Sequence, residues 1–478
     1  MACMILLASC SDYVGGDSNV DPNRTKNMTL EGLFPSVIES TATNHYFVEF
    51  YTGQFSQHLA SYFVAGSDSY FETRIPSGWT SIYLTTLTNL DQLVKQAKEQ
   101  NSPYYEGAGK ILQALNLGMA TDCWGDVPFS DAFQGSANLT PSYDSQEQIY
   151  ITIGSLLDEA ILLLQQPTSL FKPGVDDLVY NYNGTTTSPA KWIKLAYSLK
   201  ARYAIHYTKI NPAKASADAL AALTNAISSN TEDFQLLYNS VNRNPWFNNV
   251  SSPIITSNFT VGPSSQIVNL MNGNQYPGVI DPRLPKLFDI NGSATYSGLV
   301  NGTGGGGSSR TSVNTFYMAQ AAPLPMVTFA EMKFIEAEAR FLANGGTTTS
   351  TGSTQAAYDA YIVGITAHMQ KVGVATADID TYKANTNAVA PNAASLTLQL
   401  IMKEKYIAMF LNPENWTDVR RYDYSNTIYK GMQLPANYNS ALGGDFIRRV
   451  LYPLDEINRN TEEVSPKVKN MQDKMWWN

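Results

Sequence analysis

Apolar residues recur at steps of three and four positions through much of the chain, which is the spacing of one buried helix face. The first such stretches lie at residues 82–97, 108–119, 149–164 and 192–203. Further stretches lie at 220–227, 332–342, 358–369 and 400–410. The pattern therefore predicts a mainly α fold.

Residues that favour helix starts precede several of these stretches. Ser145 is suited to cap one helix, and Thr328 with Glu331 has the spacing of a capping box. Pro189 and Pro212 are suited to the first turns of the helices that follow them. These boundaries agree with the apolar period.

Consecutive helices with short connections bury their apolar faces best as antiparallel hairpins stacked into a solenoid. Between about residues 240 and 327 the helical period disappears, and Pro, Gly, Asn and aromatic residues dominate. Long irregular segments in compact proteins are usually functional loops or flexible insertions. We expect a single domain over 10–478, with its ligand contacts in this loop-rich insertion.

An apolar run at residues 4–8, followed by Ser9 and Cys10, resembles a lipobox. Signal peptidase would cut before Cys10, which would carry the lipid, and residues 1–9 would be the remnant of a signal peptide. A full export signal has a basic region and about 7–15 apolar residues. We therefore expect the natural precursor to extend upstream of Met1.

Charge and composition limit the classes of partner. The chain has 32 basic and 41 acidic residues, a formal net charge of -9, which repels nucleic acid and anionic lipid. After the first residues, no stretch approaches the roughly 20 apolar residues of a membrane-spanning helix. We expect no nucleic-acid partner, and membrane attachment only through the N-terminus.

Metal and cofactor sites are not predicted. Cys3 lies in the presumed signal and Cys10 carries lipid, which leaves Cys123 alone. No CxxC pair occurs, and the four histidines are widely spaced: His45, His58, His206 and His368. The sequence therefore predicts no metal and no cofactor.

Enzyme motifs give no positive evidence either. Residues 302–307 formally fit GxGxxG, but no strand precedes them and no helix follows, so we interpret them as a flexible loop. P-loops, nucleophile elbows and kinase signatures are absent. A glycosidase pair of carboxylates is possible in principle, but a sequence does not reveal one. We expect a protein without catalytic residues.

Aromatic residues make up 11% of the chain, with 28 Tyr, 7 Trp and 19 Phe, which suits a surface that stacks on sugar rings. Rings on helical stripes are structural by default. Rings in irregular segments are our candidate ligand contacts: Tyr70, Phe71, Trp79, Trp246, Tyr276, Tyr296, Phe316 and Tyr317. The alternative is that these rings pin their loops to the core.

Charged clusters have a structural interpretation. Arginines beside carboxylates more often tie down loops and helix ends than bind ligands, and we apply this to Arg283 beside Asp281 and to Arg420 with Arg421. Glu404, within an apolar stripe, is expected to pair with one of these arginines.

Several further segments together resemble the SusD/RagB family of outer-membrane nutrient-binding lipoproteins, in particular its SusD-like branch. After the Cys10 lipobox they are KILQAL (110–115), TDCWGDVPFSDA (121–132), PSYDSQEQIY (141–150), KWIKL (191–195), DPRL (281–284), EKYIAMF (404–410), ENWTDVRRY (414–422) and RRVLYP (448–453). In this order they cover nearly the whole mature chain.

The resemblance implies a scaffold of about four TPR-like helix hairpins with a more irregular, ligand-binding part. It implies a lipid anchor in the outer membrane, an outward-facing body, and an oligosaccharide bound by an arc of aromatic rings. It also implies a SusC-like TonB-dependent transporter as partner, over which the protein lies as a lid. The carry-over of the ligand site favours the loop up to Trp79 and the segment 243–325.

Two alternative functions remain open at this point. The RagB branch of the same resemblance implies capture of peptides, which needs a larger cleft with polar groups directed at a peptide backbone. A surface glycosidase is the other alternative. Competition by peptides would indicate peptide capture, and release of reducing ends from a bound glycan would indicate a glycosidase.

Overall fold

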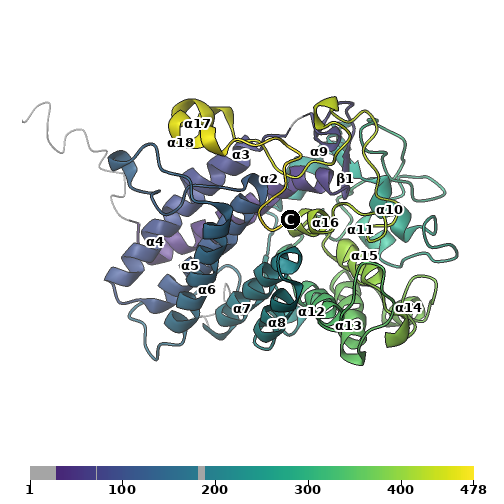
Figure 1. Ribbon diagram of the computed structural model, residues 1–478, viewed down its shortest axis with the longest axis horizontal. Helices are drawn as coiled ribbons and strands as arrows, with labels where there is room; N and C mark the ends of the chain where they lie inside the picture. The colour runs from purple at the N-terminus through teal and green to yellow at the C-terminus, as the bar shows by residue number, and fades with distance from the viewer. Residues whose placement is uncertain (1–27, 72, 181–188) are drawn as a thin grey trace, which may run out of the picture.

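The computed structural model describes residues 28–71, 73–180 and 189–478, and its architecture is mainly α. A row of helices runs from α4 to α13 along one side of the molecule, and the loop-rich segments lie together on the other side (Figure 1). Within the described ranges, no helix has the length and apolar character needed to span a membrane. The predicted lipobox and signal remnant lie outside the described residues.

The first half of the chain contains the inner helix α2, the short helix α3 and most helices of the row. They are α2 (Leu30–Phe55), α3 (Pro76–Thr80), α4 (Thr88–Glu99), α5 (Pro103–Trp124), α6 (Gln146–Leu164), α7 (Pro189–Ile205) and α8 (Pro212–Leu223).

Helices of the second half complete the scaffold. They are α9 (Ser252–Ile255), α10 (Ser265–Met271), α11 (Leu284–Leu287), α12 (Phe329–Ala343), α13 (Gln355–Lys371), α14 (Thr376–Lys383), α15 (Leu398–Ala408), α16 (Glu414–Arg421), α17 (Leu454–Arg459) and α18 (Thr461–Val464).

Neighbouring helices pack as the predicted hairpins. α4 packs on α5, α5 on α6, α6 on α7 and α7 on α8, and the row continues through α12 to α13. Each helix buries one apolar face against the next, as in a helical-repeat solenoid. The predicted mainly α fold with a helical-hairpin scaffold is confirmed.

The predicted helix starts are confirmed where a cap is encoded locally. Ser145 accepts a hydrogen bond from the backbone of Gln148 at the start of α6. Thr328 and Glu331 form the complete capping box of α12. Pro212 occupies the first turn of α8, as expected.

Helix α2 was not predicted, although it is the longest helix among the described residues. Polar side chains interrupt its apolar stripe, and several of them, including Asn44, His45 and Glu49, are nevertheless buried. The helix lies inside the molecule and packs on α4, α5 and both small sheets. A helix buried all round has no single apolar face, so the sequence period does not reveal it.

Two predicted helices differ in detail. The stretch at 82–97 contains a π-helical segment, η3 (Ser81–Leu87), that connects α3 to α4. The stretch at 400–410 ends as a helix at Ala408, and Phe410 lies beyond it.

Short elements dominate the segment between α8 and α12. β2 (Phe234–Leu236) pairs antiparallel with β4 (Leu324–Val327), and β1 (Leu59–Ser61) pairs antiparallel with β3 (Val261–Pro263). A short π-helical segment, η7 (Phe247–Ser251), precedes α9. The two ladders anchor the ends of the irregular segment to the helical scaffold.

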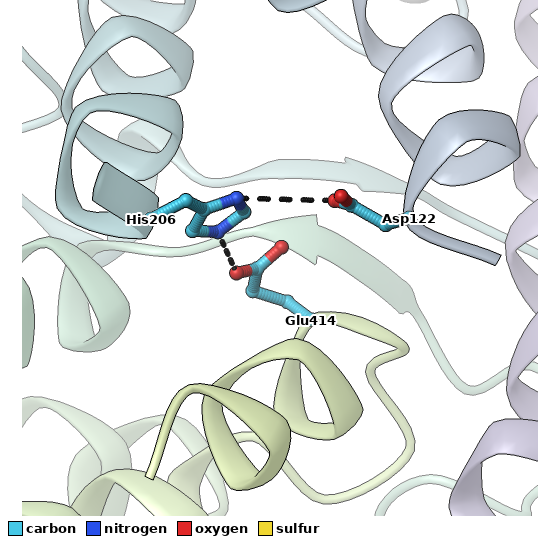
Figure 2. Close-up of side chains that lie close together, drawn as sticks. All are labelled: Asp122, His206 and Glu414. Atoms are coloured by element: carbon cyan, nitrogen blue, oxygen red, sulfur yellow. Dashed lines mark hydrogen bonds and ion pairs between the residues drawn. The ribbon is translucent and has the colours of Figure 1, made fainter. Parts of the chain in front are cut away.

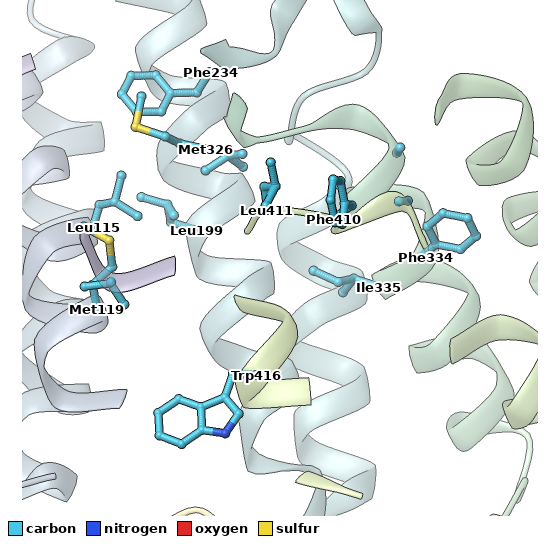
Figure 3. Packing of buried hydrophobic residues seen from close by; sticks show 14 of the residues in the cluster. Leu115, Met119, Leu199, Phe234, Met326, Phe334, Ile335, Phe410, Leu411 and Trp416 are labelled. Carbon is cyan, nitrogen blue, oxygen red and sulfur yellow. The ribbon is translucent and has the colours of Figure 1, made fainter. Parts of the chain in front are cut away.

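One hydrophobic core connects both parts of the molecule (Figure 3). The side chains shown there come from α5, α7, β2, β4, α12 and α16: Leu115, Met119, Leu199, Phe234, Met326, Phe334, Ile335 and Trp416. The loop between α15 and α16 adds Phe410 and Leu411. The irregular part is therefore packed onto the scaffold and does not form a separate body.

Buried ion pairs fix the loops, as expected. The Arg283 guanidinium donates to Asp281 at 2.6 Å and to Glu404 at 2.7 Å, so the predicted pairing of Glu404 is confirmed. Arg421 pairs with Glu338 at 2.8 Å, and Arg420 donates to the backbone carbonyls of Asp122 and Arg448. These arginines hold helices and loops together and do not reach a surface.

Candidate functional site

Five of the eight predicted ligand contacts lie in the core. Tyr70, Trp79, Trp246, Tyr276 and Tyr317 each expose 6% of their surface or less. Stacking on a sugar requires a ring face that is open to solvent, and these rings have none in this structure. For these five residues the alternative interpretation holds, namely that loop aromatics pin their loops to the core.

Trp79 lies on a helix and is buried by the aromatic rings that surround it. Pro76 begins α3, so the predicted loop ends before Trp79. The indole ring packs edge-on against Trp124 at 5.1 Å and against Tyr452 at 6.0 Å between ring centroids. Tyr143 stacks parallel to it at 6.4 Å.

Trp246 and Tyr317 attach the irregular segment to the helices. The Trp246 ring meets Tyr46 of α2 edge-on at 4.9 Å. The Tyr317 ring lies 5.8 Å from Phe410, and its hydroxyl lies 3.2 Å from Nε2 of His368. Both rings fasten loops that follow no regular period.

Tyr70 and Tyr276 are buried for different reasons. Tyr70 has a left-handed backbone, with φ of 68°, at the end of a short 3-10 turn, which directs its ring onto Phe55. The Tyr276 ring has two ammonium groups near it, from Lys403 at 4.6 Å and Lys430 at 4.7 Å. Such cation–π contacts stabilise a loop without a ligand.

Three predicted contacts remain accessible. Phe71 exposes 51% of its surface, and Tyr296 and Phe316 are partly exposed. Phe316 packs edge-on against the buried Tyr317 at 4.9 Å. These three residues stay predicted contacts, and Phe71 is the most exposed of them.

One exposed ring, Phe63, and two partly exposed rings, Tyr62 and Phe259, were not predicted. Tyr62, Phe63 and Phe259 lie where the β1–β3 ladder ends, and with Tyr296 we call them the aromatic patch. The Tyr62 and Phe259 rings are 5.1 Å apart, and the Arg310 guanidinium lies 4.5 Å from the Phe259 centroid. Phe63 is 60% exposed. The patch presents rings and one guanidinium, the groups that grip sugars by stacking and hydrogen bonding.

Strand pairing explains the patch. The backbone N–H of Tyr62 donates to the carbonyl of Thr260, which extends the β1–β3 ladder by one bond and places Tyr62 beside Phe259. The Ser297 N–H donates to Ser309, next to Arg310, so the segment with Tyr296 adjoins the same surface. Residues almost 200 positions apart in the sequence therefore share this surface, a relation that no local pattern reveals.

The glycine-rich loop, predicted to be flexible, packs closely against its neighbours in this structure and supports the patch. The Gly302 N–H donates to Asp68 at 2.8 Å, and a Cβ on Gly302 would lie 1.7 Å from the carbonyl oxygen of Ala436. A Cβ on Gly304 would lie 3.1 Å from the backbone nitrogen of Val64. The glycines permit close backbone packing.

A hollow lies on the helical side of the molecule. This helical groove has a volume of about 720 Å³ and lies between α6, α7 and α8. Tyr197, Tyr207 and Trp476 line it together with Lys200 and Asp218. The groove is aromatic with charges of both signs.

A group of ionisable side chains lies buried at the junction of α5, α7 and α16 (Figure 2). Nε2 of His206 lies 2.5 Å from a carboxylate oxygen of Glu414, and Nδ1 lies 3.9 Å from Asp122. The hydroxyl of Tyr150 bridges the gap, at 2.7 Å from Nδ1 and 2.5 Å from Asp122.

Burial controls the charges of this group. It lowers the pKa of His206 to about 3 and raises the pKa of Glu414 to about 7. It also raises the pKa of Asp122. A neutral imidazole therefore shares its hydrogen bonds with a carboxyl group that keeps its proton more readily than usual.

Asp122, His206 and Glu414 converge in space although the histidines are widely spaced in the sequence. All three are metal-ligand residue types, and their ligand atoms lie within 4.8 Å of one another. Both ring nitrogens already have protein partners, however, and Arg202 lies 4.0 Å from Glu414, where it opposes a cation. The arrangement best explains how three helix ends are tied together.

Comparisons with known proteins identify the family. A family profile described as "Starch-binding associating with outer membrane", SusD-like, matches residues 22–453. No curated protein matches the chain.

Solved structures share the fold. A SusD homologue from Bacteroides uniformis has a TM-score of 0.74 and 23% identity, over 93% of this chain and 99% of its own. A chitin-binding SusD homologue from Flavobacterium johnsoniae has a TM-score of 0.74 and 21% identity, over 94% and 98%. A SusD homologue from Parabacteroides distasonis has a TM-score of 0.75 and 20% identity, over 94% and 98%.

The family profile covers most of the chain. The fold of this chain agrees with the solved structures over nearly their full lengths. The chain belongs to the SusD-like family of proteins that associate with the outer membrane.

Proposed function

We propose that this protein binds glycan at the cell surface without cleaving it, and delivers it to a SusC-like TonB-dependent transporter. The family description names starch binding, and one solved homologue is a chitin-binding protein. The observation that carries the proposal for this chain is the aromatic patch, where the partly exposed rings of Tyr62 and Phe259 meet Arg310. Of the residues predicted from the sequence, Tyr296 belongs to the aromatic patch, while Phe71 and Phe316 stay predicted contacts that are not part of it.

Attachment to the membrane is part of the proposal. Cys10 would carry the lipid after removal of residues 1–9, and the folded part would face outward. A Cys10→Ala variant, expressed with its natural export signal, should appear in the soluble fraction while the unchanged protein sediments with outer membranes. Equal membrane retention of both proteins would contradict the lipid anchor.

Glycan binding is tested by titration calorimetry against a panel of polysaccharides. Phe63→Ala and Tyr296→Ala should each weaken binding at least tenfold, because each removes a stacking face that is worth about 1.4 kcal/mol or more. Phe171→Ala is the matched control, since Phe171 is 42% exposed and its ring is not part of the patch. If both patch variants bind like the unchanged protein, the patch is not the glycan site.

The non-catalytic part of the proposal has its own test. The purified protein should release no reducing ends from any glycan that it binds. Release that a single carboxylate substitution abolishes would establish the glycosidase alternative instead.

Peptide capture is a second candidate function, and the helical groove favours it. Its volume of about 720 Å³ and its mixed charges suit a peptide segment better than the patch does. Competition between peptide mixtures and a bound glycan separates the two functions. A peptide that binds tightly while no glycan does would favour the RagB-like alternative.

A further inference from the structure

Besides the helical groove, the molecule has a smaller hollow that is lined by carboxamide side chains. We call it the amide pocket. It has a volume of about 210 Å³ and lies among residues 265–275, 300–301 and 431–436. Its polar side chains include Gln57, Ser265, Gln266, Asn269, Gln275 and Gln433. None of the described residues that line it is charged, which distinguishes it from the helical groove.

Several of these amides have hydrogen-bonding atoms left over. Gln57 and Gln266 each use Nε2 on a backbone carbonyl, of Gln433 at 2.6 Å and of Lys430 at 2.9 Å. Both residues are only 4% exposed, and no described residue donates to either Oε1. The Oε1 atom of Gln275 is buried without a hydrogen-bond partner in the described part of the chain. Among the described residues that line the pocket, Gln275 thus has an acceptor that is both buried and unpaired, and buried polar atoms are normally satisfied.

The backbone around the pocket holds these amides in place. A Cβ on Gly431 would lie 2.1 Å from Nε2 of Gln275, and Gly431 has a φ of +85° that favours glycine. Gln57 itself has a φ of 61°, a left-handed conformation that is uncommon for a residue with a side chain. The ammonium group of Lys430 donates to the backbone carbonyl of Gln275 at 2.6 Å. The pocket is therefore built by specific contacts and is ready to accept a ligand.

The lining restricts the chemistry of the ligand. An amide offers both a donor and an acceptor, and a sugar hydroxyl needs both. No lining side chain is charged, and the ammonium group of the adjacent Lys430 already donates to the backbone carbonyl of Gln275, so a charged ligand would lose its hydration without a free countercharge on the lining. Pockets for drug-sized ligands have about 300–1,000 Å³, so this smaller hollow suits a single ring.

We propose that the amide pocket binds one neutral, hydroxyl-rich sugar ring of the glycan. This proposal rests on the proposed function and adds a ligand class to it: neutral hexose units, to the exclusion of uronic acids. Val300 and Asn301 line the pocket, while Gly304 of the same loop packs against Val64, next to Phe63. The loop thus separates the pocket from the aromatic patch, so a chain lying on the patch could insert a branch or an end into the pocket.

Titration calorimetry at millimolar concentrations tests this with methyl glucoside, methyl galactoside, methyl mannoside and methyl glucuronoside. At least one neutral glycoside should bind, and the glucuronoside should bind at least tenfold more weakly. Gln275→Leu should weaken binding of the neutral glycoside at least tenfold. The fold should be preserved, because the Gln275 side chain makes no internal hydrogen bond in the described structure. Gln433→Ala, at an exposed position, serves as a second variant, and exposed Gln165→Leu is the control.

The outcomes separate this inference from the proposed function. If polysaccharide binds and Phe63→Ala weakens it, but no neutral glycoside binds, the amide pocket proposal fails and the proposed function stands. Binding of the glycoside that is unaffected by both Gln275→Leu and Gln433→Ala also overturns the pocket. If no polysaccharide binds at all, the proposed function fails first.

Discussion

Gly302 has a backbone conformation and a surrounding space that admit only glycine. Its φ is +80°, and a Cβ would lie 1.7 Å from the carbonyl oxygen of Ala436. We expect Gly302→Ala to lower the free energy of unfolding by at least about 2 kcal/mol. The backbone strain of the positive φ adds to the cost of displacing Ala436. Urea unfolding measures this change. The loop supports the aromatic patch, so glycan affinity should fall as well.

Gly305→Ala is the matched control for that substitution. Gly305 lies three positions further along the same loop, and a Cβ there would meet no atom within 4 Å. Its stability should therefore stay within about 0.5 kcal/mol of the unchanged protein. Equal effects of the two substitutions would mean that the loop is as flexible as its composition suggests.

At the scale of elements, the start of α12 joins a local cap to a long-range ion pair. Glu331 completes the capping box with Thr328, and it also receives two hydrogen bonds from the Arg202 guanidinium of α7, at 2.6 and 2.7 Å. Arg202 is 4% exposed and Glu331 is fully buried. Thr328→Ala should cost about 1 kcal/mol of stability, as lost caps do. Glu331→Gln should cost about 3–5 kcal/mol, because it removes the nearest countercharge of a buried guanidinium and leaves only the more distant Glu414.

Urea unfolding of the two variants checks this difference. Thr354→Ala removes the cap of α13, which lacks a capping box, and should cost about as much as Thr328→Ala. If Glu331→Gln costs no more than either cap, the ion pair does not hold α7 and α12 together.

Features that depend on residues close together in the sequence could be predicted, and features that depend on distant residues could not. Ser145 and Thr328 cap helices through partners three residues away, so both starts could be read from the sequence. The buried group at His206 could not, because Glu414 lies 208 residues away and only the packed helices bring them together. For the same reason, the sequence identified aromatic loops but not which rings face solvent: Trp79 is buried and Phe63 is exposed.

The whole molecule carries its histidines in the core, and this determines how its stability depends on pH. All four are buried, and burial is the largest cause that lowers their pKa values, to about 3 for three of them and well below 6.5 for the fourth: His45, His58, His206 and His368. The unfolded chain protonates each near pH 6.5, while the folded chain keeps it neutral. Each therefore contributes stability that is present above pH 6.5 and is lost as the pH falls, by about 1.4 kcal/mol per pH unit.

Buried carboxyl groups with raised pKa values, among them Glu49, Asp122 and Glu414, act in the opposite direction. Burial raises the pKa of Glu414 to about 7 and the pKa of Glu49 well above 4.5, so the folded chain binds these protons before the unfolded chain does. Their contributions grow as the pH falls towards 4.5 and offset part of the loss that the histidines cause. We therefore expect the free energy of unfolding to fall between pH 7 and 5, but less steeply than four histidines alone would require.

Urea unfolding at pH 7, 6 and 5 measures this slope. His368→Gln should flatten it by about 1.4 kcal/mol per pH unit, since the amide can accept from Arg283 and donate to Tyr317 as the neutral ring does, without titrating. A slope that is unchanged in this variant would show that His368 does not stay neutral in the folded protein. A protein whose stability does not change between pH 7 and 5 would mean that the core takes up protons as readily as the unfolded chain.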